Sequence, residues 1–169
     1  QSKDWKALTT PSELTYEESK MLEFFALCTD ASYEVIDGKE KKIGDPTEIA
    51  LVAFANQFDL HKSNLEAELP RVDELPFDSV RKMMSTKHSF ENKTITFTKG
   101  ALDSCLKHTT KILEKGCVRD ISDSDIEKIY AANKFFSDKA LRVLALTYNN
   151  KDNIEENDLV FVGLVAMID

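Results

Sequence analysis

The amino-acid sequence predicts an α/β (α+β) fold, in which helices flank a mostly antiparallel, twisted sheet. Alternating β-branched residues, as in Thr94–Thr98, are typical of strands. Apolar residues three and four apart, as in Leu102–Leu113, are typical of amphipathic helices. The strands predicted at 142–148 and 159–168 are joined by one polar segment, 149–158, which favours antiparallel pairing of the two.

The first third of the chain carries two helix starts and a turn. Thr15 and Glu18 form a capping box, which predicts a helix that directs Leu22 and Phe25 inward. The pair Asp37-Gly38 is typical of a two-residue turn and predicts a small hairpin over 33–43. A second helix is expected from Asp45, since Asp45 can cap it, Pro46 suits its first position and Glu48 its third.

The middle and end of the chain alternate between strands and helices. A mixed stretch, 58–75, leads into a strand at Leu75–Phe77, residues 80–88 are expected to be extended, and Asn92 is the expected turn before Thr94–Thr98. The helix predicted over 102–113 should end at Gly116, and a further helix should begin at Ser122. The apolar strand 159–168 is expected to be buried on both faces.

Composition limits the classes of function. The chain has 169 residues, of which 42% are hydrophobic and 31% charged, a balance typical of one globular domain. A net charge of −8 argues against general binding to nucleic acid or anionic membranes. The longest apolar run, Leu159–Ile168, is much shorter than the about 20 residues of a membrane-spanning helix, so no direct membrane insertion is expected.

The cysteines and the ends of the chain give two further expectations. Cys28, Cys105 and Cys117 are odd in number and widely spaced, which fits buried free thiols in a reducing compartment better than a disulfide framework. The chain opens on Gln1 and closes on Asp169 directly after its most apolar stretch, which suggests a domain excised from a larger protein.

The common catalytic and metal-binding motifs are missing. The five glycines fit neither a Gly-rich dinucleotide turn nor a Walker loop, and there is no nucleophile elbow. His61, His88 and His108 are dispersed, with no cysteine at zinc spacing. Asp123 does not begin a calcium loop, because the sixth position holds Lys128 where glycine is required. The sequence therefore predicts neither a catalytic residue nor a metal site.

Four short segments carry the functional signal: Asp45-Pro46-Thr47-Glu48, the stretch 75–85 (LPFDSVRKMMS), Thr98-Lys99-Gly100-Ala101 and Leu141-Arg142-Val143-Leu144-Ala145. In this order and spacing they resemble the nucleotide-binding (N) domain of the type II P-type ATPases, the cation pumps phosphorylated on aspartate, and most of all the bacterial calcium pumps. The resemblance covers nearly the whole chain. The last segment, 162–169, resembles the strand that returns to the phosphorylation domain, where Asp169 would begin the hinge.

A nucleotide pocket needs an aromatic face for the base, a directional acceptor to distinguish adenine from guanine, and cations for the phosphates. The resemblance implies one residue for each task. Phe77 would stack on adenine, Glu48 would lie near the amino group of the base, and Arg142 would reach the phosphates. The remaining residues implied at the site are pocket lysines (Lys82 and Lys99), a glycine that lets the backbone approach (Gly100) and apolar walls (Met84 and Leu144).

Each of these assignments has a plainer alternative. Phe77 could belong to the core, and Glu48 could serve only its helix terminus. Either Arg81 or Lys82 should face solvent, since neighbours on an extended chain alternate, with Lys82 the better candidate for the pocket. Arg142 could pair only with a surface carboxylate. Animal calcium pumps often carry an arginine where this chain has Ser79, which leaves one phosphate contact in question.

The resemblance implies that residues 1–169 form a single ATP-binding domain of a larger membrane pump, on the cytoplasmic side of the cell membrane. It would bind ATP with Mg²⁺ at roughly 0.1–1 mM and present the γ-phosphate to an aspartate of the phosphorylation domain, without turnover by itself. Its partners would be the phosphorylation and actuator domains, with the isolated domain a monomer. Two alternatives remain: a nucleotide-independent protein-interaction module with this fold, and a small stand-alone phosphotransferase.

Overall fold

A computed structural model describes residues 14–168, so Asp169, the expected start of the hinge, lies outside the described residues. The helices and strands follow in chain order as α1 (Tyr16–Leu27), β1 (Ser32–Ile36), β2 (Lys39–Ile43), α2 (Pro46–Gln57), α3 (Lys62–Glu68), β3 (Arg71–Asp78), β4 (Met83–Phe90), β5 (Lys93–Gly100), α4 (Leu102–Lys107), β6 (Thr109–Glu114), β7 (Cys117–Asp120), α5 (Asp123–Ser137), β8 (Arg142–Asn149) and β9 (Leu159–Met167).

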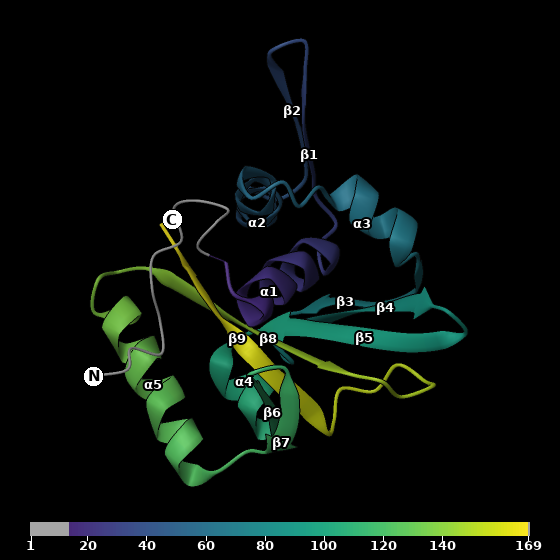
Figure 1. Cartoon of the computed structure of the whole chain (residues 1–169). Helices are drawn as coiled ribbons and strands as arrows, with labels where there is room; N and C mark the ends of the chain where they lie inside the picture. Colours follow the sequence, from purple (N-terminus) through teal and green to yellow (C-terminus); the bar gives the residue numbers. More distant parts are fainter. Residues whose placement is uncertain (1–13, 169) are drawn as a thin grey trace.

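The main sheet has seven strands in the order β3-β4-β5-β8-β9-β6-β7. Every neighbouring pair is antiparallel except β6 and β9, which run parallel. Helices α1, α2 and α3 cover one face of this sheet, and α4 and α5 cover the other (Figure 1). The prediction of a mostly antiparallel sheet flanked by helices is therefore confirmed.

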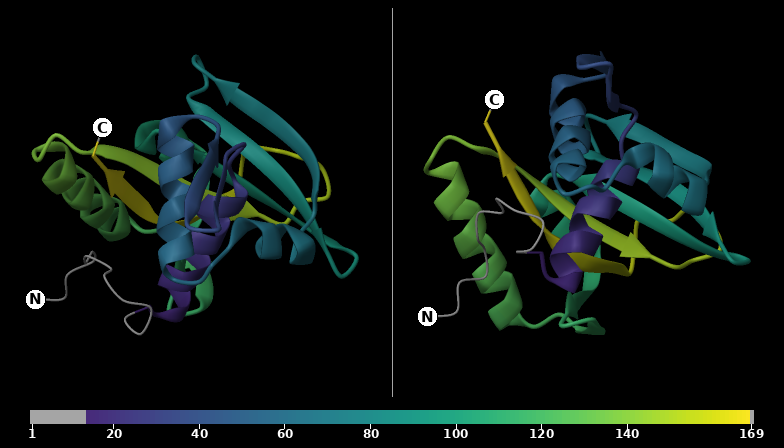
Figure 2. Two further views of the ribbon diagram at one scale, coloured as in Figure 1. Left: turned by 90° about the horizontal axis from the view of Figure 1, so that it is seen from above. Right: turned by 45° about the horizontal axis from the view of Figure 1, so that its top comes forward.

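Strands β1 and β2 form a separate hairpin that projects from the body of the domain (Figures 1 and 2). Asp37 and Gly38 occupy its turn with positive φ angles of 52° and 75°, as the sequence predicts. The two predicted helix starts are confirmed as well. The Thr15 side chain accepts from the backbone of Glu18 in a reciprocal capping box, and the Asp45 carboxylate caps α2.

The helix predicted over 102–113 is wrong in its second half. Helix α4 ends at Lys107, and Thr109–Glu114 form strand β6 between β7 and β9. The β-branched Thr109 and Thr110 resist a helix, and pairing with two strands satisfies the backbone of this segment. Gly116, with a φ of 76°, turns the chain from β6 into β7 instead of ending a helix.

Other differences concern burial and boundaries. Strand β9 is buried at Leu159–Phe161 but half-buried over 162–167, so the prediction of burial on both faces holds only for its first residues. The mixed stretch contains the short helix α3, and β4 begins at Met83 because residues 79–82 form a turn. All three cysteines are free, yet Cys117 is exposed, contrary to the expectation of burial.

Apolar side chains form a core on each face of the sheet. Leu22, Phe25, Phe97 and Leu146 belong to the cluster under α1 and α2, while Met83, Cys105, Ile129, Ala145 and Phe161 belong to the cluster under α4 and α5. Since successive strand residues face opposite sides, Met83 and Met84 contribute to different clusters. In residues 14–168 no helix combines the length and the apolar character that crossing a bilayer requires.

The buried His88 makes the stability of the fold dependent on pH. Its Nδ1 lies 2.8 Å from the carbonyl oxygen of Leu69 and its Nε2 2.9 Å from the hydroxyl of Thr86. A carbonyl only accepts, so Nδ1 carries the proton and Nε2 of the neutral ring accepts from Thr86. Burial lowers the pKa of His88 from its ordinary value of 6.5.

We expect this histidine to destabilise the fold in mild acid. Below about pH 6.5 the unfolded chain binds a proton that the native ring resists, so the free energy of unfolding falls as pH falls through this range. The urea midpoint of the wild type should drop more between pH 7.5 and 5.5 than that of His88→Gln. Equal drops in the two proteins would show that His88 does not carry this pH dependence.

Candidate functional site

The eight residues predicted for the site come from one border of the sheet and the helix above it. Because β4, β5 and β8 are antiparallel, the start of β4, the end of β5 and the start of β8 meet at the same border. Met84 pairs with Lys99, and Lys99 pairs with Leu146, which places their side chains on the face covered by α1 and α2. Leu144, two residues before Leu146, lies on this face too and packs against the same core cluster.

A nearly buried ion pair lies at the centre of this border. Lys99 is only 6% exposed, and its Nζ lies 2.6 Å from Oε2 of Glu48 in the first turn of α2. The same ammonium donates to the carbonyl oxygen of Cys28 at 2.5 Å. The Glu48 carboxylate also accepts from the backbone N–H of Asp30, at 3.3 Å. Asp45 caps the helix, so the carboxylate of Glu48 does more than serve its own helix terminus.

The segment between α1 and β1, residues 28–31, holds this ion pair through its backbone. Arg71 donates to the carbonyl oxygen of Thr29 at 2.5 Å and to that of Leu27 at 3.3 Å. Lys62 donates to the carbonyl oxygens of Thr29 and Ala31 at 2.9 and 2.6 Å. Three cations, counting Lys99, therefore converge on the carbonyl groups at the C-terminal end of α1, where the helix dipole favours positive charge.

Phe77 lies near the end of β3 with 62% of its surface exposed. This exposure rules out the alternative that Phe77 is a core residue. Val80 in the following turn is 90% exposed, and Ser79 between them is exposed as well. A large aromatic side chain left in solvent beside a charged site offers a surface on which a flat ring can stack.

Gly100 allows the strands at this border to approach each other closely. A Cβ added at Gly100 would lie 2.9 Å from the Cα of Met83 and closer still to the carbonyl oxygen of Lys82. That oxygen accepts from the backbone N–H of Ala101 at 3.1 Å. The side chain of Lys82 is exposed, whereas Arg81 donates to the carbonyl oxygens of Pro76 and Met83. Of the two neighbours, Arg81 is therefore the one turned inward and Lys82 the one directed to solvent, whereas alternation along an extended chain favoured Lys82 for the pocket.

Arg142 and the two apolar residues complete the set. Arg142 is exposed and donates to the hydroxyl of Thr47 at 3.1 Å, which joins the start of β8 to the first turn of α2. Met84 is 4% exposed, and Leu144 is partly buried. The structure thus brings Glu48, Met84, Lys99 and Leu144 to one face, with Arg142 beside the same helix terminus.

The motifs did not reveal the residues that support this border. Lys62 and Arg71 donate to carbonyl groups of residues 27–31, which lie 31 to 44 residues earlier in the chain, and Lys99 donates to that of Cys28, 71 residues earlier. In the sequence neither Lys62 nor Arg71 stands in a recognisable motif, so no local pattern distinguishes these two residues from other charged side chains.

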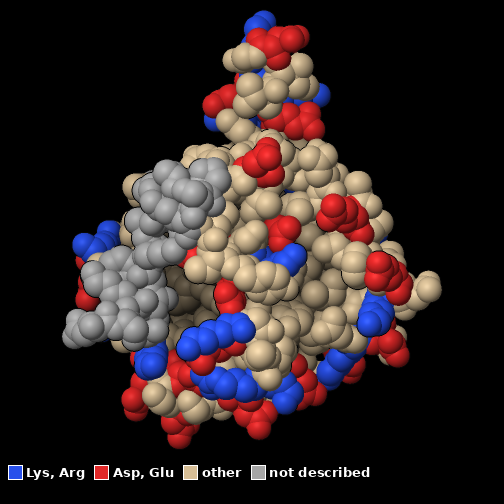
Figure 3. Space-filling model, in the orientation of Figure 1, with Lys and Arg blue, Asp and Glu red and all other residues tan. Residues whose placement is uncertain are grey.

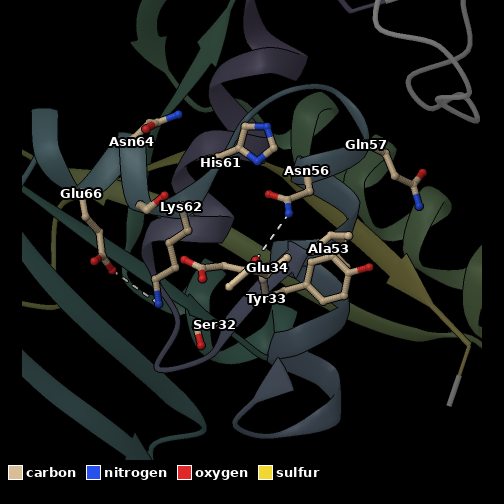
Figure 4. A pocket seen from close by; sticks show the side chains of 13 residues that line it. Ser32, Tyr33, Glu34, Ala53, Asn56, Gln57, His61, Lys62, Asn64 and Glu66 are labelled. Atoms are coloured by element: carbon tan, nitrogen blue, oxygen red, sulfur yellow. Dashed lines mark hydrogen bonds and ion pairs between the residues drawn. The ribbon is translucent and has the colours of Figure 1, made fainter. Parts of the chain in front are cut away.

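Two cavities lie elsewhere in the described part of the chain. The first, of about 660 Å³, lies between the projecting hairpin, α2 and α3, where Asn56 donates to the backbone of Tyr33 and Lys62 pairs with Glu66 (Figure 4). The second, of about 600 Å³, lies between α1, α5 and β9. None of the eight predicted residues lines either of these two cavities.

Charge on the surface is mixed. On the face shown in Figure 3, acidic and basic side chains lie together over the projecting hairpin and along the lower border, and the surface between them is mostly uncharged with a few charged side chains. Neither sign of charge therefore dominates this face.

Replacing Lys99 by methionine should destabilise the fold. Removing one partner of a nearly buried ion pair leaves the Glu48 carboxylate without its cation, at a cost of about 3 kcal/mol in the free energy of unfolding. The double variant Glu48→Gln/Lys99→Met should recover part of this loss, as measured by urea unfolding. A double variant less stable than Lys99→Met would contradict this account of the pair.

Comparisons with known proteins agree with these observations. A family model described as the cytoplasmic domain N of P-type ATPases matches residues 17–169. A protein named calcium-transporting ATPase 1 from Bacillus cereus is 44% identical over 156 residues, which cover 88% of this chain and 17% of the relative. Calcium-transporting ATPase 1 of Lactococcus lactis is 38% identical, with 94% and 19% covered, and the calcium-transporting ATPase of Bacillus subtilis is 32% identical, with 93% and 19% covered. The chain thus spans about a fifth of the length of these relatives.

Proposed function

Since this chain belongs to the family of the cytoplasmic N domain of P-type ATPases, we propose that it binds ATP and presents the γ-phosphate to an aspartate in another domain of a cation pump. The observation that carries this proposal is the Glu48–Lys99 pair beside the glycine border, with Phe77 exposed nearby. The names of the relatives support calcium as the transported ion.

The base is proposed to stack on Phe77. Because the Phe77 ring is already exposed, binding requires little rearrangement of the fold around it. Stacking of a base on such a ring contributes about 1–3 kcal/mol. Met84 and Leu144 would supply apolar walls from the adjoining strands. Because Gly100 has no side chain, the ligand could approach the backbone closely at this position.

Selection of adenine over guanine is assigned to Glu48. A carboxylate only accepts hydrogen bonds, so it suits the exocyclic amino group of adenine and repels the carbonyl oxygen that guanine carries at that position. Its bonds to Lys99 and to the Asp30 N–H fix its orientation and leave lone pairs for the base. A site whose polar groups are held in place discriminates more strongly between similar ligands.

The phosphates are assigned to the exposed cations Lys82 and Arg142. Because two cations alone are assigned to the phosphates and both are exposed, the affinity for ATP should be weak, with a Kd of roughly 0.1–1 mM. Bound Mg²⁺ would offset part of the phosphate charge. It is expected to arrive with the nucleotide, and no group of three or more His, Cys, Asp or Glu side chains in residues 14–168 is arranged to hold a metal ion. Weak binding suits a domain that must release ADP in every cycle.

The proposed role is that of a positioning domain in a parent pump. Phosphoryl transfer depends on placement of the γ-phosphate in line with its acceptor. That acceptor would belong to the phosphorylation domain, and the actuator domain would be the second partner, both on the cytoplasmic side of the membrane. The domain alone is expected to be monomeric and to bind ATP without turnover.

An amide titration by NMR tests the proposal. ATP should shift the amides of Glu48, Phe77, Lys82 and Lys99 and saturate below a few millimolar, while GTP at equal concentration should produce much smaller shifts. A parallel assay of phosphate release should show no hydrolysis. Absence of ATP-dependent shifts, or equal shifts with GTP, would refute the assigned site, and turnover would favour a complete enzyme.

A further inference from the structure

The turn between β3 and β4, residues 79–82, joins Phe77 to Lys82 and so links the proposed base and phosphate contacts. Strand pairing alone does not fix it. The register of β3 against β4 shifts between the pairs Leu75–Ser85 and Asp78–Met83, which are three residues apart on β3 but two apart on β4. Phe77 lies within this bulge. Lys82 has a φ of 59°, a left-handed conformation that a non-glycine residue keeps only when its surroundings hold it.

The side chain of Arg81 forms hydrogen bonds to the backbone on both sides of this turn. One nitrogen of its guanidinium, Nη2, donates to the carbonyl oxygen of Pro76 at 3.0 Å and to that of Met83 at 2.9 Å. Pro76 directly precedes Phe77, and Met83 directly follows Lys82. The turn is closed internally by Asp78, whose carboxylate accepts from the backbone of Val80 and Arg81 at 2.8 Å each. A single side chain thus spans the interval that contains both proposed ligand contacts.

Glu156 anchors Arg81 from a distant part of the chain. Its Oε1 lies 2.5 Å from Nε of Arg81, an ion-pair contact outside hydrogen-bond alignment, and its side chain is only 9% exposed. Its Oε2 accepts from the hydroxyl of Ser85 at 2.6 Å. The carboxylate only accepts, so Ser85 donates to it and in turn accepts from Thr98, 2.7 Å away. These groups lie on the sheet face opposite Lys99, because Ser85 and Thr98 alternate with Met84 and Lys99.

The segment that presents Glu156 is itself fixed. The buried side chain of Asn149, at the end of β8, donates to the carbonyl oxygens of Glu155 and Asn157 at 2.8 and 3.1 Å. These two residues flank Glu156 on either side, so the carboxylate is held by the sheet rather than by a loose loop. A buried, anchored carboxylate orients a guanidinium more firmly than solvent-exposed pairing does.

We infer that Arg81, held by Glu156, is a positioning residue that sets the relative placement of Phe77 and Lys82 for ATP. The inference rests on the proposed function. Neither side chain is expected to touch the nucleotide, because Arg81 is occupied by two carbonyls and Glu156, on the face away from the Glu48–Lys99 pair. Arg81 would hold Phe77 and Lys82 in their binding positions before ATP arrives, which reduces the conformational entropy lost on binding.

Glu156→Gln tests the inference, with Glu155→Gln as the matched control. Both changes remove one negative charge from the same segment, but the Glu155 carboxylate is about half exposed and its ion pair is with Lys151, at 4.0 Å. Glu156→Gln should raise the Kd for ATP about threefold to thirtyfold and increase the backbone mobility of residues 77–82 in NMR relaxation of the ligand-free chain. Glu155→Gln should leave both the Kd and the mobility unchanged.

A double-variant cycle separates positioning from general destabilisation. Arg81→Lys keeps the charge but loses the planar fork, so it should weaken ATP binding, and adding Glu156→Gln to it should cause little further loss. The melting temperature of each variant is measured alongside. If Glu156→Gln proves too unstable to study, Arg81→Lys alone must show the mobile turn and the raised Kd.

The outcomes distinguish this inference from the proposed function. If the wild-type chain binds ATP and both Glu156→Gln and Arg81→Lys bind it equally well, the positioning role is wrong and the ATP site stands. Independent, additive losses in the cycle would also overturn the link between Arg81 and Glu156. If the wild-type chain does not bind ATP, the proposed function fails, and the nucleotide role of Arg81 fails with it.

Discussion

Replacing Phe77 by alanine is expected to raise the Kd for ATP by about 5- to 150-fold while hardly changing the stability of the fold. The factor corresponds to the loss of about 1–3 kcal/mol of base stacking. The fold should tolerate the change because the ring is 62% exposed in the ligand-free chain. Titration with ATP gives the Kd, and urea unfolding gives the free energy of unfolding.

Two further variants make the Phe77 result specific. Phe77→Trp should retain most of the affinity, since a larger aromatic face still stacks. Val80→Ala changes an even more exposed apolar side chain in the adjacent turn and should leave the Kd unchanged. A Phe77→Ala protein that binds ATP like the wild type would place the base elsewhere, and an equal loss in Val80→Ala would point to the turn rather than to the ring.

Gly100→Ala is expected to lower the free energy of unfolding by about 3 kcal/mol. The added methyl group would meet the backbone of Lys82 and Met83, and backbone atoms in a paired strand cannot move aside without breaking the β4–β5 ladder. ATP binding should weaken as well, because Lys82 and Lys99 adjoin the same contact. Urea unfolding and titration measure the two effects.

Gly163 offers a matched control in the same sheet. A Cβ at Gly163 would meet the sulfur of Met21, a flexible side chain that can adopt another rotamer. Gly163→Ala should therefore cost clearly less stability than Gly100→Ala and leave the Kd for ATP unchanged. Equal losses in the two variants would mean that the close backbone approach at Gly100 is not the cause.

The sequence predicted correctly those features of the fold, such as helix caps and turns, whose hydrogen bonds join residues close together in the chain. The caps at Thr15 and Asp45 and the turn at Asp37-Gly38 bond to neighbours within three residues. The segment Thr109–Glu114 was mistaken for helix, because its conformation depends on β9, about 50 residues later in the chain. Apolar spacing at three and four cannot reveal a strand partner so distant.

The candidate site divides in the same way. Phe77, Lys99 and Gly100 stand in motifs short enough to recognise, and the structure brings Lys99 and Gly100 to one border with Glu48. The exposure of Phe77 and the arrangement of Glu156 with Ser85, 71 residues apart, required the folded chain. Residues that support a site pair through tertiary contacts, and a single sequence contains no pattern that marks such pairs.

The projecting β1–β2 hairpin has a consequence for the colloidal behaviour of the protein. Among residues 14–168 no strand pairs with the outer edge of either of its strands, and it exposes Val35, Ile36 and Ile43, features that favour edge-to-edge association between molecules. The second strand, Lys39–Ile43, carries three lysines among its five residues. Their positive charges oppose the docking of another strand along that edge, so lysine acetylation in this hairpin would remove a barrier against aggregation.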